Sequence, residues 1–154
     1  MIPLLLLLAA ITPPQQATKI VIKKSDHTLT VYHEQTKLQT YKVSLGRSTG
    51  QKQQAGDRKT PEGLYVVDAK NAGSGFHRAF HLSYPNAEDR QRAQRLGKSP
   101  GGDIEIHGQK NSLAWLGPLA RHVDWTAGCI ALNNDEIDAI WSIVPVGTTV
   151  EIDP

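Results

Sequence analysis

Cysteine is almost absent from this chain of 154 residues, which contains Cys129 alone. A single cysteine cannot form an intramolecular disulfide, so we expect core packing to hold the fold without covalent cross-links. A large excess of one charge is also absent, because 17 lysines and arginines face 15 aspartates and glutamates, a net charge of +2. So small an excess argues against nucleic acid as a partner. The length suits one compact domain.

Long hydrophobic runs are missing as well. The longest, Ile2–Ile11, has about ten residues, whereas a membrane-spanning helix needs roughly 20. The run fits the apolar part of a secretory signal, with Ala9 and Ala10 as small residues near a cleavage point, although no Lys or Arg precedes it. We predict a signal peptide and linker over residues 1–17, and a mature domain over residues 18–154 that is exported to the periplasm or cell envelope without a stable membrane span. The alternative is an uncleaved apolar anchor or a mis-assigned start.

Alternation of apolar and polar residues dominates the first half of the chain. This period of two predicts strands over 18–24, 27–34 and 37–46, which we expect to form an antiparallel meander. A polar stretch with three glycines follows over 47–63 and predicts a long loop. Further strands are predicted over 64–70, 78–84, 101–108, 128–132 and 147–152.

Two segments have the pattern of helices. Residues 86–97 begin with Asn86 as a cap and end at Gly97. Residues 133–145 combine a capping-box spacing with apolar residues at helical intervals and end at a proline. The sequence therefore predicts a mainly β fold with two helices.

Cys129 and His107 are the candidates for chemistry. Cys129 follows Gly128, which allows a sharp bend, and His107 ends an apolar strand and precedes another glycine. A cysteine with an ordinary pKa of ~8.5 needs a base to become a nucleophile, and an imidazole can serve as that base. Two other interpretations stay open: a buried, inert thiol, or a zinc site made by His107, His122 and Cys129.

The segments "IEIHG" (104–108) and "DWTAGCIAL" (124–132) resemble the catalytic signature of the L,D-transpeptidase catalytic-domain family. The family pattern is His-Gly, a spacer, and then Ser or Thr, any residue, Gly-Cys and an apolar residue. "TPEG" (60–63) matches a second family element, and the resemblance extends over residues 18–153. It implies a mixed β-sandwich-like domain with the site at one end of the sheet, and peptidoglycan stem peptides as partners.

The resemblance also implies a mechanism. Cys129 is the nucleophile and His107 the base, and a murein stem tetrapeptide forms a thioester and releases D-alanine. An amine then takes the acyl group, or water takes it in a carboxypeptidase or endopeptidase. No metal or organic cofactor is required, and a backbone carbonyl is expected to orient His107. The residues implied to hold the oxyanion or support the site are Gly128, Ala127, Thr126 and Gly108.

The sequence departs from the family at two positions. Many members have His where this chain has Ala127, and Arg or Asn where it has Ala131. We therefore consider Arg121, Trp125 and Arg47 as candidate substrate-binding residues. A zinc hydrolase and an inactive peptidoglycan-binding module are the alternative classes.

Overall fold

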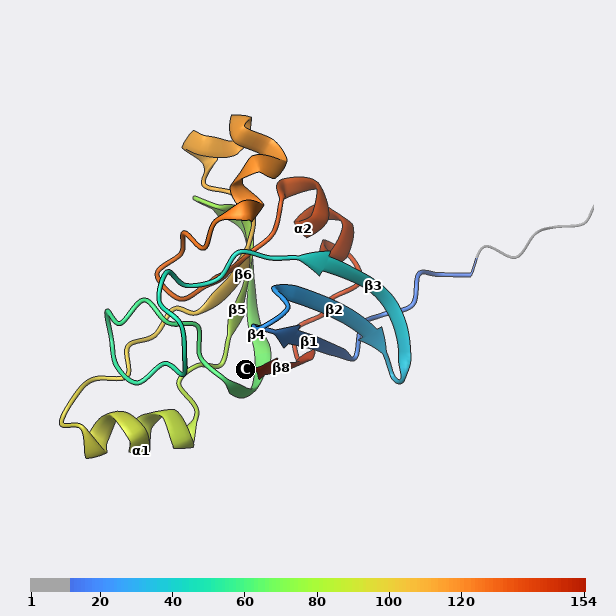
Figure 1. Cartoon of the computed structure of the whole chain (residues 1–154). Helices are drawn as coiled ribbons and strands as arrows, with labels where there is room; N and C mark the ends of the chain where they lie inside the picture. Colours follow the sequence, from blue (N-terminus) through green and yellow to red (C-terminus); the bar gives the residue numbers. More distant parts are fainter. Residues whose placement is uncertain (1–11) are drawn as a thin grey trace, which may run out of the picture.

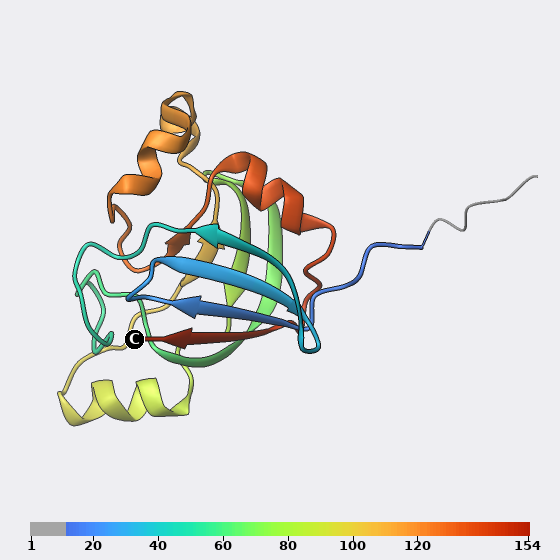
Figure 2. The ribbon, with the colours of Figure 1, turned by 45° about the vertical axis from the view of Figure 1, so that its right-hand side comes forward.

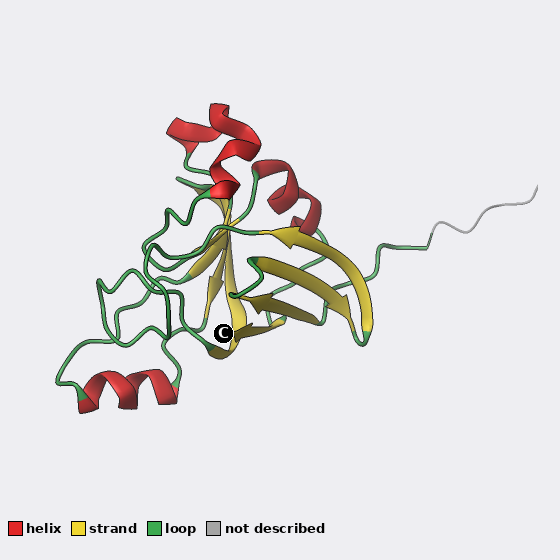
Figure 3. Cartoon of the chain, viewed as in Figure 1, coloured by secondary structure: helices red, strands yellow, loops and turns green. Residues whose placement is uncertain are grey.

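The computed structural model describes residues 12–154, except for the side chains of Pro118, Ala120, Arg121 and His122. Residues 1–11, the larger part of the predicted signal peptide, lie outside this range. Eight strands form the sheet (Figures 1 and 3): β1 (Lys19–Lys23), β2 (Thr28–His33), β3 (Thr36–Lys42), β4 (Gly63–Ser74), β5 (His77–Leu82), β6 (Glu105–His107), β7 (Ile130–Ala131) and β8 (Thr149–Asp153). Three helical segments accompany it: α1 (Ala87–Arg95), the 3-10 segment η1 (Asn111–His122) and α2 (Asn134–Trp141).

The sheet is mixed, with the strand order β3-β2-β1-β8-β4-β5-β6-β7. β1, β2 and β3 form the predicted antiparallel meander. Parallel pairing occurs between β1 and β8 and between β6 and β7. The mainly β, mixed fold predicted from the sequence is therefore confirmed.

β4 curls the sheet onto itself. Its first residues pair with β8, and from Val67 onward it pairs with β5, with two register shifts that bend the strand. Beyond β3, Ser44 exchanges both backbone hydrogen bonds with Ala131, the last residue of β7, at 2.9 and 3.0 Å. The two edges of the sheet thus meet, and Figure 2 shows the halves wrapped around the interior.

α2 covers one opening of the curled sheet. Ile137, Ile140 and Val144 are fully buried in the core, and the predicted capping box of Asn133 and Glu136 is present. α1 is also confirmed, but it lies away from the core of the sheet (Figure 1) and uses only Asp89 and Ala93 as buried residues.

η1 was not predicted. Its 3-10 geometry gives no 3.6-residue periodicity to detect, and Gly117, with φ of 51°, breaks it in the middle. The strands β6 and β7 are shorter than predicted, because only residues 105–107 and 130–131 pair with a neighbouring strand. η1 therefore adds a third helical segment beside the end of β6.

Candidate active site

Two short neighbouring strands place Cys129 and His107 on one face of the sheet. β6 and β7 are parallel, with Ile106 opposite Ile130. Both isoleucines point into the core, where they are fully buried. Because side chains alternate along a strand, His107 and Cys129 point to the other face. The candidate base and the candidate nucleophile are thus diagonal neighbours.

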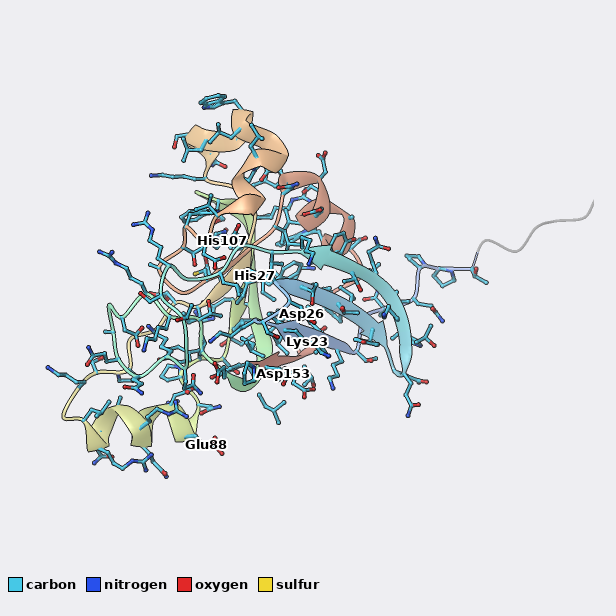
Figure 4. The ribbon with its side chains drawn as sticks, viewed as in Figure 1. Lys23, Asp26, His27, Glu88, His107 and Asp153 are labelled. Atoms are coloured by element: carbon cyan, nitrogen blue, oxygen red, sulfur yellow. The ribbon has the colours of Figure 1, made fainter. Side chains whose placement is uncertain are left out.

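Cys129 and His107 line one pocket of about 530 Å³. Figure 4 shows His107 at the end of the sheet nearest η1. A molecule that fills this pocket can therefore contact both side chains. Its other lining residues are Arg47, Phe76, Asp103, Glu105, Lys110, Leu113, Trp125, Thr126 and Ala127.

The backbone holds the imidazole of His107 in one tautomer. The residue is 2% exposed, and Nδ1 lies 2.6 Å from the carbonyl oxygen of Gly108. A carbonyl can only accept, so Nδ1 carries the proton and Nε2 is left as an acceptor. Burial lowers the pKa of His107 below its usual value, which keeps the ring neutral at pH 7. The predicted backbone carbonyl partner is confirmed.

The thiol of Cys129 is protonated at rest. Sγ lies 3.5 Å from the carbonyl oxygen of Asp103. Burial raises the pKa of Cys129 to about 11, and the charges of Glu105 and Asp103 add to the rise, while a hydrogen bond with the Glu105 backbone and the charge of Lys52 oppose it. The resting pocket thus holds a neutral thiol and a neutral imidazole, and a nucleophilic role of Cys129 would require a base to take the thiol proton.

The hydroxyl of Thr126 holds the turn that carries Cys129. Oγ1 donates to the carbonyl oxygen of Cys129 at 2.7 Å and accepts the N–H of Gly128 at 3.1 Å. The N–H of Gly128, predicted as an oxyanion donor, is thus used inside the turn. In the described part of the chain no hydrogen bond uses the N–H of Ala127 or Cys129, which leaves these two as candidate oxyanion donors.

The loop over 47–62 braces this turn from outside. Gly128 has a φ of 137°, and a Cβ on it would lie 2.8 Å from the carbonyl oxygen of Lys59. Thr60, from the "TPEG" element, accepts the N–H of Gly46 through Oγ1 at 2.9 Å. The loop thus approaches the turn so closely that only a glycine fits at position 128.

Arg47 and Trp125, two of the candidate substrate-binding residues, both line the pocket. Nε of Arg47 donates to the carbonyl oxygen of Trp125 at 3.1 Å, and the side chain is otherwise exposed. The guanidinium therefore supplies a positive charge at the pocket wall. The side chain of Arg121 lies outside the described residues.

Sequence reasoning missed Glu105, Asp103 and Phe76. Glu105 could have been found, because it precedes His107 by two positions on one strand and so shares its face. Phe76 could not, because it lies in the turn between β4 and β5 and reaches His107 only through the folding of the sheet.

In the described residues no group of three or more His, Cys, Asp or Glu side chains could hold a metal ion. The side chain of His122, the third member of the zinc interpretation, is not among them. The described helices are too short or too polar to span a membrane.

Fold and pocket together define a β-rich domain with a cysteine and a histidine at the end of its curled sheet. Residues 17–152 match the L,D-transpeptidase catalytic domain. The chain belongs to this family.

The chain spans about half the length of the curated relatives it matches. It is 30% identical to YafK of Escherichia coli (strain K12) over 132 residues, which cover 81% of this chain and 46% of YafK. The helical cell shape determining protein Pgp2 from Campylobacter jejuni matches with a TM-score of 0.68 and 29% identity, over 90% of this chain and 48% of that one. L,D-transpeptidase 1 of Mycobacterium tuberculosis shares the fold, with a TM-score of 0.55 and 20% identity, over 90% of this chain and 62% of that one.

Proposed function

We propose that this domain is an exported L,D-transpeptidase of peptidoglycan. Cys129 forms a thioester with a murein stem tetrapeptide, releases D-alanine and passes the acyl group to an amine. The observation that carries the proposal is the shared pocket of Cys129 and His107, in which Nε2 is the free acceptor. Membership of the family supplies the substrate class.

Acylation uses the neutral resting pair. Nε2 of His107 accepts the thiol proton while Sγ of Cys129 attacks the carbonyl carbon that precedes the terminal D-alanine. The carbonyl oxygen becomes an oxyanion, which the N–H groups of Ala127 and Cys129 stabilise. The imidazolium then gives its proton to the leaving nitrogen, the C–N bond breaks, and a thioester remains.

Transfer runs the same steps with a new nucleophile. The acceptor amine attacks the thioester carbon, His107 takes a proton from its nitrogen, and the sulfur leaves and regains a proton. The product is an amide cross-link between two stem peptides. If water attacks in the same position, the product is a carboxylic acid, and the partial exposure of Cys129 favours this hydrolysis as the second candidate.

Arg47 and Trp125 are proposed to bind the donor peptide. The donor ends in the carboxylate of D-alanine, which the exposed guanidinium of Arg47 can pair with. The ring of Trp125 forms an apolar wall beside His107.

Incubation with purified sacculi tests the proposal. We expect new cross-linked muropeptides, or shortened stem peptides if hydrolysis dominates, in a profile of the digested sacculi. Cys129→Ala should give neither product, and His107→Gln should lower the rate by about 10² or more, the usual size of a general-base contribution. His33→Gln, a half-buried histidine at the end of β2 that does not line the pocket, is the matched control and should behave as wild type.

Two results would overturn this assignment. One is an unchanged muropeptide profile with folded wild-type protein. The other is activity of Cys129→Ala at a tenth or more of the wild-type rate, because removal of a true nucleophile lowers the rate by far more than tenfold. Activity lost to a chelator would instead favour the zinc hydrolase.

A further inference from the structure

Phe76 places an aromatic ring against the candidate base. It lies in the turn between β4 and β5, and its ring stacks on the imidazole of His107 with 4.3 Å between centroids and 29° between planes. Trp125 completes a cluster of three rings, 5.7 Å from His107 and 6.1 Å from Phe76. One face of the imidazole is therefore covered by Phe76.

The backbone of Phe76 contacts Gly108, the residue that follows this histidine. The N–H of Gly108 donates to the carbonyl oxygen of Phe76 at 3.0 Å and also lies 3.2 Å from that of Arg78. The carbonyl oxygen of Gly108 is the group that accepts Nδ1–H of His107. Phe76 thus anchors the N–H of Gly108, and the carbonyl of the same residue, in the next peptide group, accepts the Nδ1 proton of His107.

The turn itself is tied down. Ser74 accepts the N–H of Phe76 through Oγ at 3.0 Å. Asn111, at the start of η1, donates its backbone N–H to Gly75 at 3.0 Å and accepts the N–H of His77 through Oδ1 at 3.0 Å. Three hydrogen bonds therefore fix the backbone from which the ring of Phe76 extends.

We propose that Phe76 is the positioning residue of the base: by stacking on His107 and anchoring Gly108, it holds the imidazole in the orientation and the dry environment in which Nε2 receives the Cys129 proton. The inference rests on the proposed function, since it assigns a role only if Cys129 is acylated. Phe76 itself does not touch the reacting atoms.

The stack has a measurable electrostatic consequence. The cover of Phe76 removes water from one face of the imidazole, and burial is the first cause that lowers the pKa of His107. If the ring is removed, water returns, and the imidazole is protonated at a higher pH. Such a variant keeps the other titratable and charged residues that line the pocket with His107, which are Arg47, Asp103, Glu105, Lys110 and Cys129.

The test uses the full chain and a carbapenem as the acylating probe, with intact mass spectrometry from pH 5 to 9. Phe76→Met and Phe76→Leu keep an apolar side chain and the carbonyl but lose the ring, whereas Phe76→Tyr keeps the ring. We expect the two ring-free variants to be acylated about tenfold more slowly at the plateau, and the acidic limb of their profiles to move up by about half a pH unit or more. Phe76→Tyr should restore both, and Leu64→Met, an exposed position on β4, should match wild type.

The outcomes separate this inference from the function it rests on. If acylation is slower at the plateau of the pH profile but the acidic limb does not move, Phe76 has only a structural role, and the inference is overturned. A pH profile of Phe76→Met equal to that of wild type overturns it as well. If Phe76→Leu does not fold, Phe76→Met alone decides. Failure of the wild type to be acylated, or acylation of Cys129→Ala, overturns the proposed function as well.

Discussion

The charge of Glu105 acts on the thiol of Cys129 across a single strand pairing. Extending the β6–β7 register by one residue puts Glu105 directly opposite Cys129. No described side chain forms an ion pair or hydrogen bond with the Glu105 carboxylate, and burial raises the pKa of this carboxyl above its usual value. The pocket therefore keeps a half-buried negative charge next to the candidate nucleophile.

Glu105→Gln should make Cys129 more reactive. Removing the charge lowers the pKa of Cys129 from about 11, although burial remains and keeps it above the ordinary value of ~8.5. Alkylation by iodoacetamide at pH 8 should therefore be a few times faster, and its pH profile should move to lower pH. Glu88→Gln, on the exposed side of α1 (Figure 4), is the control. Equal profiles for Glu105→Gln and wild type would contradict the prediction.

At the scale of elements, the turn that carries Cys129 and the long loop form one unit. The turn is closed by Thr126, and the loop presents the Lys59 carbonyl to Gly128. Neither segment is regular secondary structure, so their geometry depends on each other and on the bridge between Gly46 and Thr126.

Gly128→Ala should break this unit. A Cβ would be 2.8 Å from a backbone oxygen, at a φ that side chains rarely adopt, and the strain should lower the free energy of unfolding by about 2 kcal/mol. Acylation of Cys129 should fall with it, because the turn has to shift. Gly73→Ala, which meets nothing closer than 3.8 Å, should stay within about 0.5 kcal/mol of wild type. Urea denaturation measures both, and equal stability of the two variants would refute the argument.

Elements with a strong local pattern were predicted well and those without one were not. α2 and the meander follow from periodicity and caps within a few residues. The course of β4 over twelve residues was underestimated, since its bulges and its change of partner depend on β5 and β8.

For the whole molecule, the contacts of the domain begin one or two residues before the predicted boundary. Ala17 is buried, and its N–H donates to Ile143 at 2.6 Å. The N–H of Thr18 donates to Tyr32 at 2.9 Å. The backbone carbonyl oxygen of Gln16 accepts a hydrogen bond from Nδ1–H of His33 at 2.6 Å.

A chain that starts at Gln16 should therefore keep the thermal stability of the full chain, whatever the fate of the predicted signal peptide. A chain that starts at Lys19 loses the contacts of Ala17 and Thr18 and should melt several degrees lower, as about 1 kcal/mol implies for a domain of this size. Thermal unfolding followed by circular dichroism compares the two. A shorter chain as stable as the longer one would show that these contacts contribute nothing.

The sequence by itself determined the classes of element, the candidate residues and the order of the motifs, because these depend on neighbours along the chain. Periodicity separates strands from helices, and the His-Gly and Gly-Cys motifs carry the family resemblance within a few residues each. Cys129 and His107 are thus candidates from the sequence alone.

Only the tertiary structure decided which residues surround Cys129 and His107 and how both side chains are protonated. The curl of the sheet brings β6 beside β7, presses Phe76 onto His107 and directs the N–H of Gly128 into its own turn. Burial then sets the protonation of the resting pair, neutral thiol beside neutral imidazole. Burial and long-range contacts depend on residues that are far apart in the sequence, so the pattern of one segment cannot predict them.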